Sequence, residues 1–253
     1  MVNKKTILTF LLLLLFLPFQ VQAEGKDPVT IGTRNNALTA AVSYLGAMKE
    51  CDEKAMDKYS VSITEQDRQK QGENCKKLLL EHAEVTDYII VSNDLALVST
   101  KLDYANKVVV QTSPIVKIEG KWKIVVGIEQ QHPFTSVKET NPNIIEAINT
   151  YLESIKSANQ KGIDTYGKQL SKDNQQTEGL LEGSESNSFQ YQVDGVKMVA
   201  NSVAIASIKT KVNEQIKEQK YVVYLEDSTW KVISDRYLVT ASIPKSANPV
   251  KVE

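Results

Sequence analysis

The apolar positions along this chain change their spacing, and the change occurs in both halves. Apolar residues recur every three or four positions between Leu38 and Met48 and again between Ile145 and Ile155, which predicts an amphipathic helix in each place. After the first helix the spacing falls to two in segments rich in valine and isoleucine, which predict strands over residues 87–92, 94–102, 107–118 and 121–128. Helices followed by a run of strands indicate an α+β fold.

Local signals place the helix ends. In the first half a second helix is expected to start at Thr64, where Asp67 forms a capping box, and to carry residues 78–80 toward its end. In the second half Asn143 follows Pro142 and is the expected N-cap of the opening helix.

A tight turn is expected before the last strand of each half. Glu119 and Gly120 separate two strands at a place where a hairpin needs positive φ, which glycine adopts readily. In the second half the expected turn is longer and covers residues 226–229, "EDST".

The two halves repeat each other in sequence. Residues 44–59, "YLGAMKECDEKAMDKY", match residues 151–166, "YLESIKSANQKGIDTY", at an offset of 107 residues (151 − 44). Residues 93–99 match residues 201–207 at an offset of 108, and "EGKWKIV" matches "DSTWKVI" at that same offset. Such a small drift over a whole repeat indicates an internal duplication. The repeat anchors form matched pairs: Tyr44 with Tyr151, Asp57 with Asp164, Tyr59 with Tyr166, and Trp122 with Trp230.

The duplication predicts two domains in tandem. Each tryptophan is expected to begin the last strand of its half and to pack against the first helix of that half, which buries a large aromatic surface. The proline-containing stretch between the halves has no regular spacing of apolar residues, as is typical of a linker. We expect a signal peptide over 1–23, a first domain over 24–130, a linker over 131–142, a second domain over 143–240 and a C-terminal tail over 241–253.

The N-terminal segment is typical of an export signal. Lys4 and Lys5 precede a long apolar run, and Ala23 supplies the small residue that a signal peptidase requires. Pro18 and Gln20 interrupt this run before it reaches the roughly 20 apolar residues of a spanning helix. We therefore expect a secreted, extracytoplasmic protein, cleaved after Ala23 and without an integral membrane span. An uncleaved N-terminal anchor is the alternative.

Charge and cysteine content add two constraints. Lys and Arg number 30 against 31 Asp and Glu, so the chain lacks the concentrated basic charge that nucleic-acid binding requires, and this function is not expected. Both cysteines, Cys51 and Cys75, lie in the first repeat. Export into an oxidising space favours a disulfide between them, and two buried free thiols are the alternative.

The helix segments 44–59 and 151–166, with the strands that contain "EGKWKIV" and "DSTWKVI", resemble the nuclear transport factor 2-like superfamily, the cystatin-like α+β cone. Within it the chain is similar to exported bacterial branches of unknown function. The resemblance implies two tandem cone domains, each with N-terminal helices packed in a strongly bent antiparallel sheet. The superfamily includes isomerases, dehydratases, protein-binding modules and secretion-machine subunits, so the fold alone names no function.

Enzymes of this superfamily act inside the cone with Tyr, Asp or His, which makes the repeated acid–aromatic pairs candidates. Asp57 with Tyr59, and Asp164 with Tyr166, could exchange a proton. Alternatively they are scaffold, with the Asp organising the turn between helices and the Tyr wedged beneath the sheet. Because both pairs keep the same spacing, the scaffold interpretation is favoured.

The histidines give little support to catalysis. His82, expected near a helix end, suits a helix dipole better than a catalytic role, and His132 lies in the predicted linker. Neither has a counterpart in the second repeat, and two such residues make a poor metal site. We predict no catalytic, cofactor-binding or metal-ligating residue.

The function predicted from these observations is non-catalytic binding of a partner protein or of the cell envelope, with a secretion or conjugation apparatus as one setting. A small apolar ligand inside a cone is the alternative, and an isomerase- or hydrolase-type enzyme is the third. The partner and the oligomeric state stay open. A deep cavity with converging polar groups would favour a ligand, whereas filled cones beside an exposed apolar groove would favour a partner protein.

Overall fold

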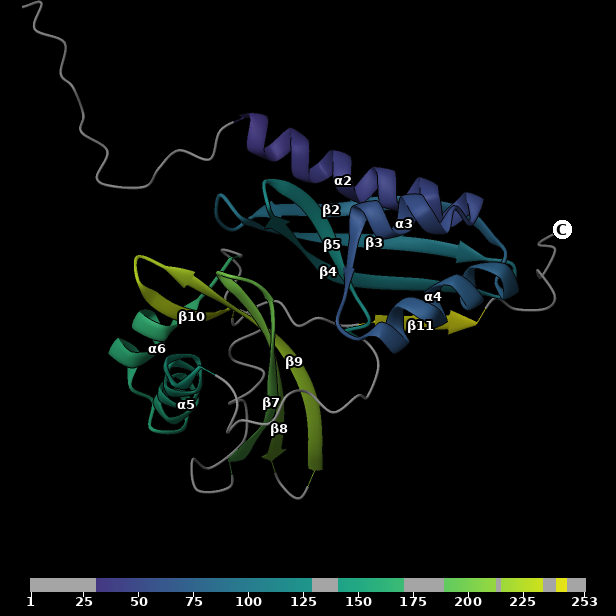
Figure 1. The fold of residues 1–253 in the computed structure, drawn as a ribbon. Coiled ribbons are helices and arrows are strands. Elements are labelled where there is room, and N and C mark those ends of the chain that lie inside the picture. Colours follow the sequence, from purple (N-terminus) through teal and green to yellow (C-terminus); the bar gives the residue numbers. More distant parts are fainter. Residues whose placement is uncertain (1–30, 129–140, 171–188, 213–214, 234–239, 245–253) are drawn as a thin grey trace, which may run out of the picture.

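The computed structural model describes residues 31–128, 141–170, 189–212, 215–233 and 240–244. In each half, helices come first and cover one face of a sheet made by the strands that follow (Figure 1). The predicted α+β class with two similar units is therefore confirmed. The predicted signal peptide over 1–23 lies outside the described residues. Within the described ranges, no helix is both long and apolar enough to cross a membrane.

Within residues 31–128, the first half contains three helices and five strands of its own. The helical part comprises α2 (Ile31–Glu50), α3 (Glu53–Tyr59) and α4 (Glu65–Lys77), with the short strand β1 (Ser60–Ser62) between the last two. The remaining strands are β2 (Leu80–Ile90), β3 (Leu95–Tyr104), β4 (Lys107–Ile118) and β5 (Lys121–Val126). Their order is β1-β5-β4-β3-β2, with β1 parallel to β5 and the other neighbours antiparallel.

The second half repeats this plan. It comprises α5 (Pro142–Lys156), α6 (Gln160–Tyr166), β6 (Gly167–Lys168), β7 (Gln190–Ala200), β8 (Val203–Val212), β9 (Gln215–Glu226) and β10 (Thr229–Ile233). The order β6-β10-β9-β8-β7 matches that of the first sheet. Even the parallel pairing recurs, since Ser60 lies opposite Ile124 in the first half and Gly167 lies opposite Val232 in the second. The duplication seen in the sequence is thus a duplication of the fold.

The turn between the first two helices of each half is organised by residues that the sequence analysis missed. Cys51 and Ala158 adopt positive φ values of 53° and 51° where the first helix ends. Asp52 and Asn159 follow as N-caps of the next helix, and their side chains accept hydrogen bonds from backbone N–H groups. The expectation that Asp57 and Asp164 organise this turn is therefore wrong.

The hairpins that lead into β5 and β10 are both two-residue turns. Glu119 and Gly120 have φ values of 49° and 77°, as the sequence predicted for a tight hairpin. Asp227 and Ser228 also have positive φ, 49° and 64°, and Glu226 pairs directly with Thr229. The longer turn expected over 226–229 is wrong, because Asp227 and Ser228 adopt positive φ values as Glu119 and Gly120 do in the first half.

Two helix ends differ from expectation. The N-cap of α5 is Asn141, whose side chain accepts from the N–H of Asn143, because Pro142 itself occupies the first turn of the helix. Helix α4 has the predicted capping box of Thr64 and Asp67, but it ends at Lys77 rather than continuing through residues 78–80. Leu80 instead begins β2, where its side chain is buried in the core.

Each half has its own apolar core between its helices and its sheet. In the first half Tyr44 of α2 and Trp122 of β5 pack together in this core, and in the second half Tyr151 and Trp230 do the same. The tryptophans therefore pack on the helical side of their sheets, as predicted. We call this helix-covered side of each sheet the cone-facing side, and the space beneath the helices the first and the second cone.

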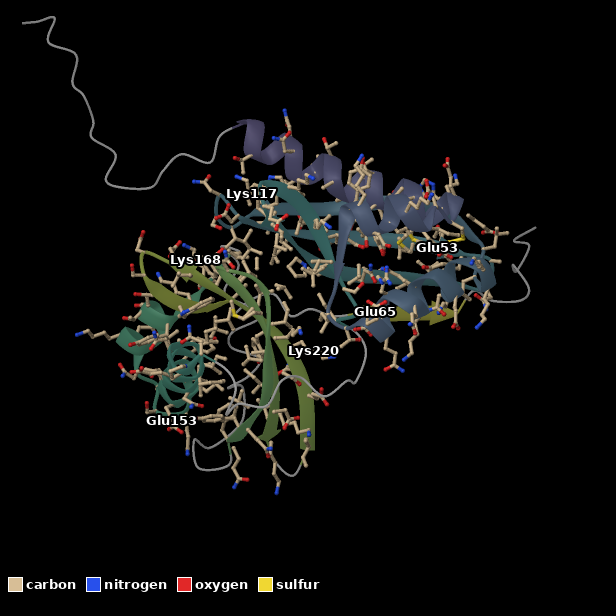
Figure 2. The ribbon with its side chains drawn as sticks, in the orientation of Figure 1. Glu53, Glu65, Lys117, Glu153, Lys168 and Lys220 are labelled. Carbon is tan, nitrogen blue, oxygen red and sulfur yellow. A yellow bond between two sulfur atoms is a disulfide. The ribbon has the colours of Figure 1, made fainter. Side chains whose placement is uncertain are left out.

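A third core joins the two halves. It contains residues from the opposite faces of both sheets, including Leu95, Leu97, Val116 and Val125 of the first sheet with Val203, Ile205, Val222 and Tyr224 of the second. Lys220, which Figure 2 shows between the halves, donates a hydrogen bond from Nζ to the carbonyl oxygen of Ile128. The sheets therefore pack back to back, and the halves are joined by apolar burial as well as by the chain.

The end of the chain returns to the first sheet. Residues 240–244 form strand β11 (Thr240–Pro244), which pairs antiparallel with residues 107–111 of β4. The segment 241–253 was expected to be a tail, but its first four residues belong to this strand. The reason is the length of β4: β5 pairs with β4 only over residues 115–118, so the rest of that edge is open to a second strand.

Candidate functional site

The first cone contains a cavity of about 290 Å³. Helices α2, α3 and α4 form one side of it, and the cone-facing residues of β3 and β4 form the other. Its apolar lining includes Met48, Met56, Leu78, Leu80, Leu102, Val109 and Val126. Its polar lining includes Tyr44, Gln71, Asn74, Tyr104, Gln111 and Ser113, together with Lys107 and the disulfide-bonded Cys75. A hollow that combines apolar walls with polar groups is typical of a site for a small molecule, and here the two kinds of residue are about equally represented.

The polar groups of the cavity are positioned by different elements. Tyr44 of α2 is buried, and its hydroxyl accepts a hydrogen bond from Nε2 of Gln71 on α4. On the sheet side, Gln111 and Ser113 point to the same face of β4, since residues two apart in a strand share a face. Lys107 lies on that face as well, and its Nζ is 5.7 Å from the ring centroid of Tyr104. Lys107 is the one charged residue among those that line the cavity.

A buried hydroxyl lies beside this polar wall. Thr100 of β3 is directly opposite Gln111 in the sheet, and directly opposed side chains on one face are close neighbours. The Thr100 side chain is fully buried, and its Oγ1 has no hydrogen-bond partner among the described residues. A buried hydroxyl without a partner carries a cost in free energy. Thr100 itself is not among the residues that line the cavity.

The second cone is filled at the equivalent positions. Ser113 corresponds to Tyr221 and Thr100 to Ile208, both at the offset of 108 residues. Tyr221 is 1% exposed and its hydroxyl donates to Oε1 of Gln219, while Ile208 is fully buried. Both side chains are larger than their counterparts in the first half, and Tyr221 stands where Ser113 lines the cavity. The comparison is limited to the described residues, because the segment equivalent to α4 lies outside them.

The acid–aromatic pairs do not reach the cavity. Asp57 is exposed on the outer side of α3 and is paired with Arg68 at 3.1 Å. Asp164 is exposed on α6 and accepts a hydrogen bond from Gln160. Tyr59 and Tyr166 pack at the margins of their cores, and the hydrogen bond with Lys58 lowers the pKa of Tyr59. In neither half do the acid and the aromatic residue converge on an enclosed space.

The histidines are also remote from the cavity. His82 lies in β2 rather than near a helix end, with an exposed side chain 3.9 Å from Glu84. Its position follows from the early end of α4, which leaves residues 80–90 to the strand. His132 lies outside the described residues. In the part of the chain that the structure describes, no cluster of His, Cys, Asp and Glu could hold a metal ion.

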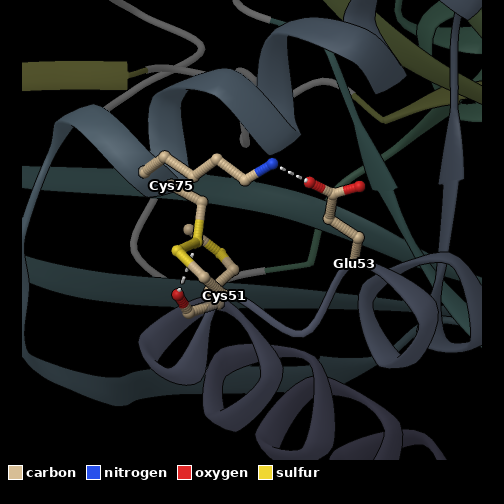
Figure 3. The surroundings of a disulfide bond; sticks show 5 residues. Cys51, Glu53 and Cys75 are labelled. Carbon is tan, nitrogen blue, oxygen red and sulfur yellow. Dashed lines mark hydrogen bonds and ion pairs between the residues drawn. A yellow bond between two sulfur atoms is a disulfide. The ribbon is translucent and has the colours of Figure 1, made fainter.

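Cys51 and Cys75 form a disulfide, as predicted. Their Cα atoms are 5.6 Å apart, and the bond joins the end of α2 to α4 beside the cavity (Figure 3). Glu53 lies next to this bond and pairs with Lys76 at 2.7 Å. Of the predicted site residues, Tyr44 and Cys75 therefore line the cavity.

Comparison with known proteins gives a likeness of fold. No protein-family model and no curated protein matches the chain. One similar structure is a cystatin-like protein from Ruminococcus gnavus ATCC 29149, at 10% identity and a TM-score of 0.28, covering 85% of this chain and 94% of that one. Another is an Ntf2-like protein involved in plasmid conjugation, at 12% identity and a TM-score of 0.25, covering 83% of this chain and all of that one. At these identities the likeness concerns the fold alone.

Proposed function

We propose that this chain is an exported, non-catalytic binding protein whose first cone holds a small amphipathic ligand. The observation that carries the proposal is the contrast between the cones. The first has a cavity of about 290 Å³ with both apolar and polar lining. At the position that matches Ser113, the described part of the second has the larger, buried Tyr221. A wall opened by a small side chain in one copy of a duplicated fold favours a ligand site in that copy.

The lining suggests the chemistry of the ligand. Methionine, leucine and valine side chains on the helices and on β2 to β5 suit an apolar body. Gln111, Ser113 and Asn74 suit a polar end that can both donate and accept hydrogen bonds. Because Lys107 is a cation that donates hydrogen bonds, this polar end can be neutral or negatively charged.

The same lining supports binding without catalysis. Proton transfer in enzymes is most often carried out by His, Asp or Glu placed at the reacting group. The residues that line the cavity include no carboxylate and no imidazole. The disulfide supports the extracytoplasmic location, because such bonds persist in oxidising compartments.

Fluorescence titration with N-phenyl-1-naphthylamine, a neutral apolar probe with one N–H group, tests this function. We expect saturable binding to the full chain and at least tenfold weaker binding to Ser113→Tyr, which reproduces the filled wall of the second cone. Asn93→Tyr adds the same ring at an exposed turn and serves as the matched control, with unchanged affinity expected. Absence of saturable binding to the unaltered chain, or equal affinity for Ser113→Tyr, would refute the proposal.

A second candidate function is binding of a partner protein at the cell envelope. The observation in its favour is the edge of β9. In the first half β11 pairs with residues 107–111 of β4, whereas the equivalent residues 215–219 of β9 have no such strand among the described residues. An open edge can accept a strand from another protein.

Affinity capture from the envelope of producing cells tests this second function, with the full chain and with Ile216→Asp as baits. Ile216 lies in the open stretch and its side chain is 67% exposed, so the substitution leaves the core intact. A protein captured by the unaltered chain and lost with the variant supports strand addition at this edge. Equal recovery on both baits contradicts it.

A further inference from the structure

Helix α4 forms one wall of the cavity but has almost no apolar side chain to hold it there. Its sequence is "EQDRQKQGENCKK", and its one buried residue is Asp67. A helix of 13 residues is marginal in water unless a packed apolar face stabilises it. By contrast, α2 and α5 each bury several apolar side chains beneath their sheets. The docking of α4 therefore depends on other interactions.

Apart from Cys75, which packs against the apolar core, the non-covalent contacts of α4 are polar and include the exposed Arg68–Asp57 ion pair. At its start Asp67 accepts hydrogen bonds from the N–H and hydroxyl of Thr64. In the middle Gln71 donates to Tyr44, and near the end Lys76 pairs with Glu53. The Lys76 and Glu53 side chains are 68% and 54% exposed, and ion pairs so exposed contribute little to stability. Water can replace most of these contacts.

Besides the chain itself, the disulfide is the one covalent attachment of α4 to the rest of the half. Cys75 sits in the last turn of α4 and lines the cavity, and it is bonded to Cys51 at the end of α2 (Figure 3). Both cysteines are partly exposed, so a reductant can reach the bond. The bond thus joins a weakly docked wall of the cavity to a firmly packed helix.

We propose that the Cys51–Cys75 disulfide is a redox latch, and that its reduction by a dithiol releases α4 and opens the first cone. A thiolate of the dithiol attacks one sulfur and forms a mixed disulfide, and its second thiolate then displaces the protein sulfur. The two cysteines gain two electrons and two protons and become thiols, while the dithiol becomes a disulfide. The latch regulates the proposed ligand site, so its effect on ligand binding rests on the proposed function.

Hydrogen exchange read by mass spectrometry tests the latch without any ligand. The folded full chain is compared before and after reduction with dithiothreitol, and with the variant Cys51→Ser/Cys75→Ser. We expect amide exchange over residues 65–77 to become at least tenfold faster on reduction and in the variant, while residues 142–156 of α5 keep their protection. If the variant folds poorly, exchange in the folded chain before and after reduction still provides the test. Unchanged exchange over 65–77 after full reduction would overturn the latch.

Titration with N-phenyl-1-naphthylamine separates this inference from the proposed function. If both hold, the oxidised chain binds the probe and the reduced chain binds it at least tenfold more weakly, because α4 supplies part of the cavity wall. If amide exchange in α4 becomes faster on reduction but the oxidised and reduced chains bind the probe equally well, the latch does not control the site. If the oxidised chain does not bind the probe but α4 still opens on reduction, the proposed ligand site fails and the opening of α4 stands.

Discussion

Ser113 and Tyr221 occupy the same position in the two repeats, yet one lines a cavity and the other fills it. Ser113 lies opposite Val98 in the first sheet, and Tyr221 lies opposite Ala206 in the second, which are themselves equivalent residues. The Tyr221 ring is 1% exposed and its hydroxyl is 3.0 Å from Oε1 of Gln219. The two repeats therefore differ at this position in how much of the space beneath the helices the side chain occupies.

Tyr221→Ser should therefore open the second cone at a cost in stability. Removing a fully buried aromatic ring is expected to lower the free energy of unfolding by about 3–5 kcal/mol, because the space left behind is not refilled. Chemical denaturation followed by circular dichroism measures this loss. Tyr104→Ser is the control, since Tyr104 is only partly buried, and it should cost about 1 kcal/mol. Equal losses for the two variants would show that Tyr221 is not a filling residue.

Trp122→Ala and Trp230→Ala should each lower the free energy of unfolding by about 3–5 kcal/mol. Each ring lies in the core of its own half, but the third core joins the backs of the two sheets. We therefore expect each variant to unfold in a single transition, with the remaining tryptophan reporting the same midpoint as circular dichroism. If the remaining tryptophan keeps the midpoint of the unaltered chain, the halves unfold independently.

Removal of β11 should weaken the first half, although the strand follows the second half in sequence. A chain ending at residue 239 loses the strand that pairs with residues 107–111 of β4. We expect faster amide exchange at residues 107–111 and a loss of roughly 1–3 kcal/mol, since several backbone hydrogen bonds disappear. A chain ending at residue 244 keeps the strand and should behave like the full chain. If both truncated chains exchange alike at 107–111, the pairing does not stabilise this edge.

Stability should fall in acid through Glu226. Burial alone raises the pKa of this carboxyl, but hydrogen bonds from Lys231 and Lys168 outweigh burial and lower the pKa from 4.5 to about 2. Because the folded-state pKa is the lower one, the stabilisation is complete above pH 4.5 and is lost as the pH falls toward 2. We expect this loss to be roughly 1–3 kcal/mol.

Urea denaturation between pH 6 and pH 2 measures this dependence. Glu226→Gln removes the titrating group and should flatten the curve between about pH 4.5 and 2. Glu146→Gln removes an exposed carboxyl on α5 and should leave the curve unchanged. If Glu226→Gln keeps the full acid dependence, the ion pairs of Glu226 do not produce it.

Much of the fold could be predicted from the sequence because its signals are local. The helical periods, the capping box at Thr64 and the turn at Glu119 and Gly120 depend on neighbouring residues, and the helical period and the final strand occur in both repeats. Strand β11 gave no such signal, because its pairing with β4 joins segments more than a hundred residues apart. The positions equivalent to its five residues, 132–136, lie outside the described residues.

The shared core and the cavity did leave signals in the sequence. Residues 95–98, "LALV", and residues 221–224, "YVVY", are apolar on both faces and are all buried, a pattern typical of strands covered on both sides. The cavity could have been inferred from the difference between Ser113 and Tyr221 at equivalent positions. The weak docking of α4 is implied by its composition, but its place as a cavity wall depends on tertiary contacts that no local pattern encodes.

The central claim, that the first cone binds a small amphipathic ligand, is tested most directly by methyl NMR of the full chain during titration with N-phenyl-1-naphthylamine. Leu80, Leu102 and Val109 line the first cone, and Ile148, Ile208 and Val223 lie in the filled core of the second half. The account predicts saturable shifts for the first set and none for the second. Shifts confined to the second set, or to exposed methyl groups such as those of Leu79 and Ile216, would contradict it.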